Sequence, residues 1–325
     1  MPVELQRGGL VLRGAPLWFD ARRRSELAFV SHAHSDHIAR HHCVIATRET
    51  LALMAHRLGP LEATHPLAYG EALEVHGHRV ELFPAGHVLG AAQVRVTRPD
   101  GHRLVYTGDL SVGPSLTATA AEVVACDTLV LEATFGHPRY RFPPQAEVYD
   151  QVAAWARRHL EARVRPVVLA YSLGKSQEAI RQLRARGLSV AAHPAIHDVS
   201  LVYEQLGVPV GARRFDGAFR EGEVGVFPPF RRGASLDGVG PRATAVLTGW
   251  ALEPWGARRS GADVAFPISD HADYPALVEW ARASGAREII TVHGFVDELA
   301  AGLQREGMFA RAVSAPVQMD LPLAL

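Results

Sequence analysis

Ser31-His32-Ala33-His34-Ser35-Asp36-His37-Ile38 is the stretch of this chain that decides its fold and its chemistry. The stretch follows an apolar run, residues 27–30, which is typical of a buried strand, so its polar side chains fall on the loop that leaves the strand. His32 and His34 alternate along the backbone and point to the same side, whereas Asp36 and His37 follow the turn and reach a second position nearby. The spacing predicts a metal site that could serve two ions.

The side chains of this loop also indicate which metals suit it. Imidazole nitrogens are common zinc ligands, and a carboxylate oxygen suits zinc or manganese. The loop contains no cysteine that would indicate an iron-sulfur or thiolate site. The alternative is a solvated polar turn without a role, which such a dense cluster disfavours.

Composition sets only broad limits on fold and function. The chain has 325 residues, of which 48% are hydrophobic and 21% charged, so it is long enough for one large domain or two cores. Its formal net charge is zero, which neither supports nor excludes a polyanionic substrate. Cys43 and Cys126 lie far apart, the N-terminus lacks a signal sequence, and no apolar run approaches the roughly 20 residues that a membrane span needs. We expect a cytoplasmic protein without a membrane segment.

The pattern of expected elements changes along the chain. Up to about residue 135 it consists of short strands and turns, with one helix at residues 48–58. After a proline-rich turn, helices and strands alternate as in a βα module, with segments expected at residues 145–161, 166–171, 175–186 and 188–192. Strands resume near residue 246, and the final segments are a helix at 274–283, a strand at 288–292 and a helix at 296–305. Residues 210–241 are rich in Gly, Arg and Pro, which predicts irregular structure or a mobile lid.

Other acidic and imidazole side chains stand near the ends of further strands or in turns. Each could be a buried structural group satisfied by hydrogen bonds. Because the chain also contains the histidine-rich loop, these side chains are candidate ligands or catalytic groups. Among them, a carboxylate is the side chain that can bridge two cations. The residues are His87, Asp109, Glu132, His271 and His293.

A different kind of candidate is Ser172-Leu173-Gly174-Lys175, which follows an expected strand and opens an expected helix. Free amides and the helix dipole favour an anion there, and Lys175, the sole lysine of the chain, adds a positive charge. The segment is therefore a candidate site for a substrate phosphate. A plain helix cap is the alternative.

With these residues together, the chain resembles the metallo-β-lactamase-fold nucleases that carry a β-CASP insertion, over nearly its whole length. The shared pattern is His-x-His-x-Asp-His, a downstream Gly-His, a Gly-Asp, an acidic strand end and two C-terminal histidines, in this order. Within that group the chain is most similar to the bacterial exonucleases encoded beside ATP-dependent DNA ligases. The segments that carry this similarity are Ala33-His34-Ser35-Asp36-His37, Glu132-Ala133-Thr134-Phe135-Gly136, Tyr171-Ser172-Leu173-Gly174-Lys175-Ser176-Gln177, Ser269-Asp270-His271-Ala272-Asp273 and Val292-His293-Gly294.

The resemblance implies an α/β fold, with a metallo-β-lactamase αββα sandwich built from residues 1–143 and 260–325 and an inserted α/β β-CASP domain at residues 144–259. It also implies two zinc ions, with manganese as the alternative metal. The first ion would be held by His32, His34, His87 and Asp109. The second would be held by Asp36, His37, the shared Asp109 and His293. Asp20 matches the family's first aspartate and would orient ligands from behind.

The implied function is hydrolysis of phosphodiester bonds in DNA, by an exonuclease acting on single strands in DNA repair. The candidate catalytic residues are Asp36, His271 and Glu132; His271 would protonate the departing 3′ oxygen while Glu132 holds its ring. Ser172, Gly174 and Lys175 would bind substrate. The expected partners are nucleic acid, with single-stranded DNA favoured over RNA, and a DNA ligase or helicase of the same pathway.

Rival functions stay open at this point. One is an RNA-processing ribonuclease of the same superfamily. His293 does not decide between DNA and RNA, because the DNA crosslink-repair branch usually has Val there, whereas both RNA processors and the ligase-associated group are expected to have His. Another rival is a metallo-hydrolase of small thioesters or lactones, which would not need the inserted module. A catalytically inactive nucleic-acid scaffold is disfavoured by the intact ligand set.

Overall fold

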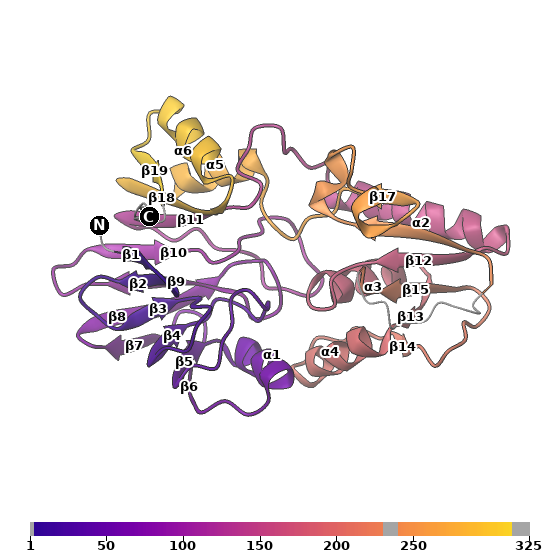
Figure 1. The fold of residues 1–325 in the computed structure, drawn as a ribbon, viewed down its shortest axis with the longest axis horizontal. Coiled ribbons are helices and arrows are strands. Elements are labelled where there is room, and N and C mark those ends of the chain that lie inside the picture. The colour runs from indigo at the N-terminus through magenta and orange to yellow at the C-terminus, as the bar shows by residue number, and fades with distance from the viewer. Residues whose placement is uncertain (1–2, 230–239, 314–325) are drawn as a thin grey trace, which may run out of the picture.

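The computed structural model describes residues 3–229 and 240–313, and strands within these ranges form three sheets. Figure 1 shows two of the sheets stacked in one half of the molecule and the third in the other half. The first sheet has the order β1 (Val3–Gln6), β2 (Gly9–Leu12), β3 (Leu17–Phe19), β4 (Leu27–Phe29), β5 (Cys43–Ala46) and β6 (Ala63–Pro66). Its strands run parallel from β3 to β6, and β4 delivers the histidine-rich loop at its C-terminal end.

The second sheet faces the first across a shared apolar layer. Its order is β19 (Ala310–Ala312), β18 (Glu288–Gly294), β11 (Thr128–Ala133), β10 (Arg103–Tyr106), β9 (Ala92–Thr97), β8 (His78–Pro84) and β7 (Ala72–Val75). Phe19, Phe29 and Ile45 of the first sheet pack in one cluster with Val94 and Val130 of the second. Burial of these side chains, at about 25 cal/mol per Å² of apolar surface, holds the two sheets together.

Helices cover the outer faces of both stacked sheets. The helix α1 (Arg48–Leu58) packs on the first sheet through Leu53 and Met54, and its N-cap Thr47 accepts a hydrogen bond from the backbone of Thr50. The helices α5 (Tyr274–Ala283) and α6 (Val296–Arg305) pack on the second sheet. The layers are therefore helix, sheet, sheet and helix, as the αββα expectation requires.

The third sheet is parallel and carries its own helices. Its order is β14 (Arg213–Arg214), β13 (Ser189–Ala192), β15 (Glu223–Phe227), β12 (Arg165–Leu169), β16 (Arg242–Leu247) and β17 (Val264–Phe266). The helices of this part are α2 (Gln145–Glu161), α3 (Lys175–Ala185) and α4 (Pro194–Gln205), and the short 3₁₀ helices η1 (Gly249–Leu252) and η2 (Arg258–Ser260) follow β16. The part lies in the chain between β11 and α5, which agrees with an inserted α/β module.

One sequence expectation for this part needs correction. Residues 210–241 are not irregular throughout, because β15 lies inside that range and forms an interior strand of the third sheet, between β13 and β12. The rest of the expected lid includes residues 230–239, which lie outside the described residues. The boundary expected at 259/260 stays a prediction, and β17, which follows it in the chain, pairs with β16 in the third sheet.

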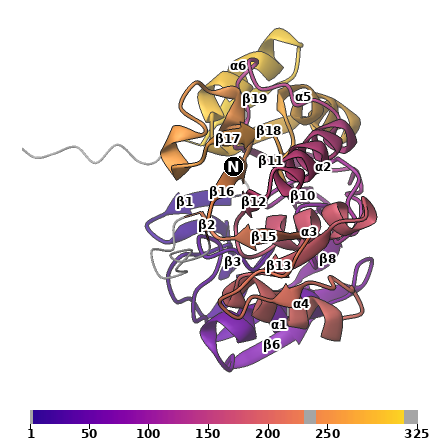
Figure 2. The same ribbon diagram turned by 90° about the vertical axis from the view of Figure 1, so that its right-hand side faces the viewer.

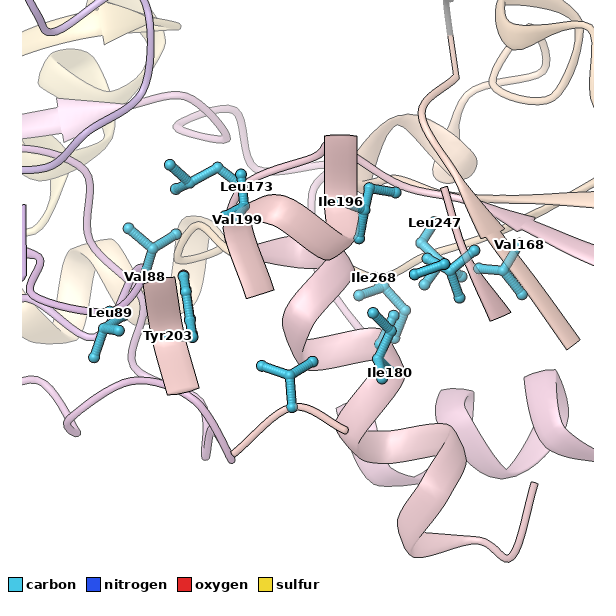
Figure 3. Close-up of a cluster of buried hydrophobic side chains, with 14 of the residues drawn as sticks. Val88, Leu89, Val168, Leu173, Ile180, Ile196, Val199, Tyr203, Leu247 and Ile268 are labelled. Carbon is cyan, nitrogen blue, oxygen red and sulfur yellow. The ribbon is translucent and has the colours of Figure 1, made fainter. Parts of the chain in front are cut away.

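The two halves of the molecule share a continuous apolar core. Val88 and Leu89, from the loop after β8, belong to the same buried cluster as Leu173, Val199 and Tyr203 of the inserted part, and Figure 3 shows these side chains lying together. The helices α1 and α4 are also in contact and lie side by side in both ribbon views (Figures 1 and 2). No helix among the described residues has the length and apolar character to cross a membrane.

Candidate metal centre

The loop after β4 is fixed from beneath by one buried carboxylate, that of Asp20. Its Oδ1 accepts the Ser31 backbone N–H at 2.7 Å. Its Oδ2 accepts hydrogen bonds from the Ser31 hydroxyl at 2.6 Å, the Tyr106 hydroxyl at 2.8 Å and His37 Nδ1 at 2.8 Å. Although burial raises the pKa of Asp20, these donors and the charge of His37 more than offset it and leave the pKa below its ordinary value. Asp20 therefore holds Ser31 and His37 of the loop, and its role in orienting metal ligands stays a prediction.

Ring nitrogens from three histidines converge with one carboxylate at the end of β4. His32 Nε2 lies 3.0 Å from His34 Nδ1, which lies 3.1 Å from His87 Nε2. Asp109 Oδ2 lies 3.4 Å from His32 Nε2 and 3.7 Å from His87 Nε2. These four residues form one group of ligand atoms within 4.8 Å of one another. They are the set expected for the first ion.

The outer nitrogens of these rings show where the protons lie. His34 Nε2 lies 3.1 Å from the Leu173 carbonyl oxygen, and His87 Nδ1 lies 2.7 Å from the Asp270 carbonyl oxygen. A carbonyl only accepts, so both outer nitrogens carry the hydrogen and the inner nitrogens present lone pairs. His32 follows the same rule, because its Nδ1 lies 2.9 Å from the Ser31 hydroxyl, which already donates to Asp20.

The inner nitrogen of His34 lies 3.0 Å from that of His32 and 3.1 Å from that of His87, and lone pairs at this spacing repel unless a cation lies among them. Burial lowers the pKa of His34 to about 4 and holds the pKa of His32 and of His87 well below the ordinary value, so protonation does not relieve the repulsion near neutral pH. Neutral imidazoles whose outer N–H groups are held by carbonyl or hydroxyl oxygens are the arrangement that zinc ligands adopt. The donor set therefore fits a zinc ion.

A second position lies next to the first, around His37. Its Nε2 lies 3.4 Å from Asp109 Oδ2 and 3.8 Å from Asp36 Oδ2. Burial lowers the pKa of His37, but the carboxylates Asp109, Asp20 and Asp36 outweigh it and raise the pKa to about 10, so positive charge is favoured here. The ring of His293 lies 5.7 Å from that of His37 between centroids, and among the described residues its buried Nε2 has no hydrogen-bond partner. An unpartnered buried nitrogen is what a ligand to a second cation would show.

Glu132 and His271 form a buried pair beside this centre. Glu132 Oε1 lies 3.1 Å from His271 Nδ1 and accepts the Leu110 backbone N–H at 2.6 Å. Burial raises the pKa of Glu132, but the His271 charge and these hydrogen bonds lower it to about 2. In return, Glu132 and Asp109 overcome the effect of burial on His271 and raise its pKa to about 9. Glu132 therefore favours the imidazolium form of His271 and holds its Nδ1.

The inserted part directly supports two of these ligands. Leu173, whose carbonyl oxygen holds His34, lies in the segment between β12 and α3. Lys175 Nζ lies 2.9 Å from Asp270 Oδ1, and Asp270 holds His87 through its own carbonyl oxygen. The Lys175 side chain is only 6% exposed. Asp270 already compensates the charge of Lys175, which disfavours its use for a substrate phosphate. That role of Lys175 stays a prediction.

The other residues of the candidate phosphate segment have local partners too. The Gly174 backbone N–H donates to Gln177 Oε1 at 2.8 Å, which is the hydrogen bond of a capped helix. Gly174 has φ +86°, and a Cβ there would lie 2.2 Å from Val88, so only glycine allows this approach of the two halves. Ser172 faces the cleft between them. These contacts favour the plain-cap alternative for Gly174.

The centre lies in a cleft of about 1220 Å³ between the two halves of the molecule. His37, Asp109 and His271 line it on one side, and Tyr171 and Trp250 line it on the other. Residues that support the site but were not assigned roles from sequence are Tyr106, Leu173, Asp270, Arg22 and Arg57. Asp270 and Tyr106 stand in the same short segments as His271 and Asp109, which is the sequence signal that could have identified them.

Comparison with known proteins places this geometry in context. Residues 12–200 match the family model described as the β-lactamase superfamily domain. Over 316 residues the chain is 37% identical to a probable DNA ligase of Opitutus terrae, a match that covers 96% of this chain and 31% of that protein. Over 157 residues it is 31% identical to the human DNA cross-link repair 1A protein, covering 46% of this chain and 15% of that protein.

A solved structure supports the fold alone. The structure of a protein of unknown function from Enterococcus faecalis superposes with a TM-score of 0.56 at 15% sequence identity. The superposition covers 89% of this chain and 79% of that one. The likeness therefore extends over both halves of the molecule.

Proposed function

The chain belongs to the β-lactamase superfamily, in its metallo-β-lactamase β-CASP nuclease family, and from this premise we propose that it is a zinc-dependent nuclease that hydrolyses phosphodiester bonds of DNA. The observation that carries the proposal is the set of inward lone pairs from His32, His34 and His87 beside Asp109, at a cleft of about 1220 Å³. The second ion is proposed at Asp36, His37, Asp109 and His293, and manganese is the alternative metal.

The proposed mechanism divides the chemistry between the metals and the protein. Zinc bound here would supply Lewis acidity and activate a water for in-line attack on phosphorus. The Asp109 carboxylate lies between the two proposed metal positions, because its Oδ2 is 3.4 Å from His32 Nε2 and 3.4 Å from His37 Nε2. Asp36 and His37 would hold the second ion. His271 delivers its Nε2 proton to the departing 3′ oxygen, because its Nδ1 is held by Glu132 and its pKa is raised to about 9. Glu132 keeps the ring aimed and charged.

The proposed substrate is single-stranded DNA, cleaved as an exonuclease in repair. The names of these two relatives concern DNA ligation and DNA cross-link repair, which supports DNA as the proposed substrate, and RNA is the alternative. In the probable DNA ligase the segment similar to this chain is joined to further sequence, so we propose that this chain acts in the same pathway as a DNA ligase. Product ladders from single-stranded and duplex DNA and RNA, each labelled at either end, test substrate and direction together; cleavage of RNA alone would favour the ribonuclease alternative.

His271→Ala tests the mechanism. We expect this variant to keep its zinc and to lose about 10²-fold or more in turnover on a labelled single strand, because only the proton donor is removed. Asp109→Ala is the matched control, and it should lose zinc as well as activity. Metal content measured on both purified variants, beside turnover, separates the two roles. Undiminished turnover of His271→Ala would remove this residue from the mechanism.

A further inference from the structure

A smaller cavity of about 100 Å³ lies beside the main cleft and shares part of its lining. Tyr171, Thr248 and Trp250 line both cavities, whereas Trp255 and Arg259 line only the smaller one. The mechanism above uses none of these side chains. The cavity belongs to the inserted part, on the segment around η1 and η2 that follows β16.

The walls of this cavity include exposed aromatic rings. Tyr171 is 49% exposed and Trp255 is 39% exposed, although large aromatic side chains are usually buried. The Trp250 and Trp255 rings stack with their centroids 5.7 Å apart and their planes at 29°. The Arg259 guanidinium lies 5.6 Å from the centre of the Trp255 ring and is itself exposed. Exposed aromatic rings therefore stand next to a positive charge.

The aromatic wall is held rigidly from behind. Trp250 packs against Phe135 at 4.9 Å and Tyr140 at 5.7 Å between ring centroids. A Cβ on Gly249 would lie 2.4 Å from Phe135, so this position admits only glycine at the observed spacing. Phe135 in turn lies 6.1 Å from His271 between ring centroids. The wall is thus part of one packed unit with the catalytic pair.

We infer that this cavity binds an unpaired nucleobase of the substrate strand, with Arg259 on a neighbouring phosphate; the inference rests on the proposed nuclease function and deepens it. A base offers a flat π face, and stacking on an aromatic side chain contributes about 1–3 kcal/mol. Arginine pairs with phosphate oxygens through its planar fork. Because a base inside a duplex is already stacked on both faces, the cavity selects single strands and frayed ends.

Tryptophan fluorescence tests the base site without requiring cleavage. We expect deoxyadenosine monophosphate to quench the fluorescence of the zinc-loaded protein and deoxyribose 5-phosphate, which lacks the base, to leave it unchanged. Trp255→Leu should lose the base-dependent quenching, whereas Trp280→Phe, at a buried tryptophan of α5, should retain it. Equal quenching by the two phosphates, or unchanged quenching in Trp255→Leu, would overturn the inference.

Kinetics on a labelled single strand give the second readout. Trp255→Leu should raise KM about tenfold with kcat within about twofold, because stacking contributes binding away from the reacting atoms. Arg259→Ala, at an exposed position that should not affect folding, should lower the salt dependence of binding by about one phosphate contact. Unchanged KM in Trp255→Leu or an unchanged salt slope in Arg259→Ala counts against the site.

The two levels of the proposal fail separately. If the wild-type protein cleaves no nucleic acid but shows base-dependent quenching that Trp255→Leu abolishes, the nuclease proposal falls and the base site stands. If the wild-type protein cleaves single strands and Trp255→Leu matches it in KM and in quenching, the base site falls and the nuclease proposal stands.

Discussion

At the scale of single residues, the proposed metal centre depends on side chains that hydrogen-bond to its candidate ligands. Asp20 has φ +46°, a backbone conformation that most residues avoid, and its carboxylate gathers donors from Ser31, Tyr106 and His37. The carboxylate accepts the Nδ1 hydrogen of His37. It also accepts the Ser31 hydroxyl hydrogen, so the Ser31 oxygen is left to accept a hydrogen bond from His32 Nδ1. One buried acid therefore sets the orientation of rings in both proposed metal positions.

Asp20→Asn should loosen the whole centre. An amide offers one acceptor oxygen in place of two, so its NH₂ group would face the N–H and O–H donors that now surround the Asp20 carboxylate. Some of these buried donors would then lack an acceptor. We expect a loss of about 3 kcal/mol in the free energy of unfolding and a 10- to 100-fold weaker zinc affinity. Urea unfolding of the metal-free protein and chelator competition measure the two effects. Tyr106→Phe is the control, since it removes one donor to Asp20 and leaves the hydrogen bond from His37 in place. If Asp20→Asn bound zinc as tightly as the wild-type protein, the orienting role of Asp20 would be contradicted.

The candidate ligands were predictable from the sequence, whereas the backbone groups that hold them were not. The four groups expected for the first ion do converge, because each stands at a strand end or in a strand-end loop and the strands bring those ends to one edge. The acceptors of the outer ring nitrogens were not predictable, since the Leu173 and Asp270 carbonyl groups are backbone atoms that any residue could supply. Only the fold decides which carbonyl comes within reach of a ring.

At the scale of elements, helices with clear apolar spacing were predicted with the bounds observed, namely residues 48–58, 145–161, 274–283 and 296–305. The strand β15 was missed because its stability comes from distant partners. Glu223 is buried but pairs with Arg213 at 2.7 Å, and Gly225 gives room to the Phe219 ring. The helix α4 was not expected, although Pro194 at its start and the spacing of Ile196, Val199 and Tyr203 carried the signal.

The segment from β12 to α3 contains an ion pair that ties the inserted part to the loop before α5. Lys175→Met would leave the Asp270 carboxylate buried without its partner, and we expect a loss of about 3–5 kcal/mol in the free energy of unfolding. Adding Asp270→Asn removes the stranded charge and keeps the carbonyl that holds His87, so the double variant should regain much of the loss. Urea unfolding of the single and double variants completes the cycle. A double variant no more stable than Lys175→Met would show that the charge pair is not the cause.

At the scale of the whole molecule, the candidate metal centre and the inserted part form one structural unit. Val88 and Leu89 share a core with Leu173, Val199 and Tyr203, so the metal loops and the insertion bury the same apolar surface (Figure 3). The hydrogen bond from His34 to Leu173 crosses the same boundary. An ion that fixes His34 should therefore restrain backbone on the far side of the cleft.

Zinc binding should stabilise both halves together. At a free zinc concentration 100 times its Kd, mass action contributes about 2.7 kcal/mol to the free energy of unfolding. We expect hydrogen exchange to slow at residues 171–174, because their loop carries the carbonyl that holds His34, as well as in the histidine-rich loop itself. His32→Ala, which removes a proposed ligand and leaves the hydrogen bond between His34 and Leu173 in place, is the matched control and should show neither effect on adding zinc. If zinc slowed exchange only in the loops after β4 and β8, the insertion would be a neighbour of the centre and not a part of it.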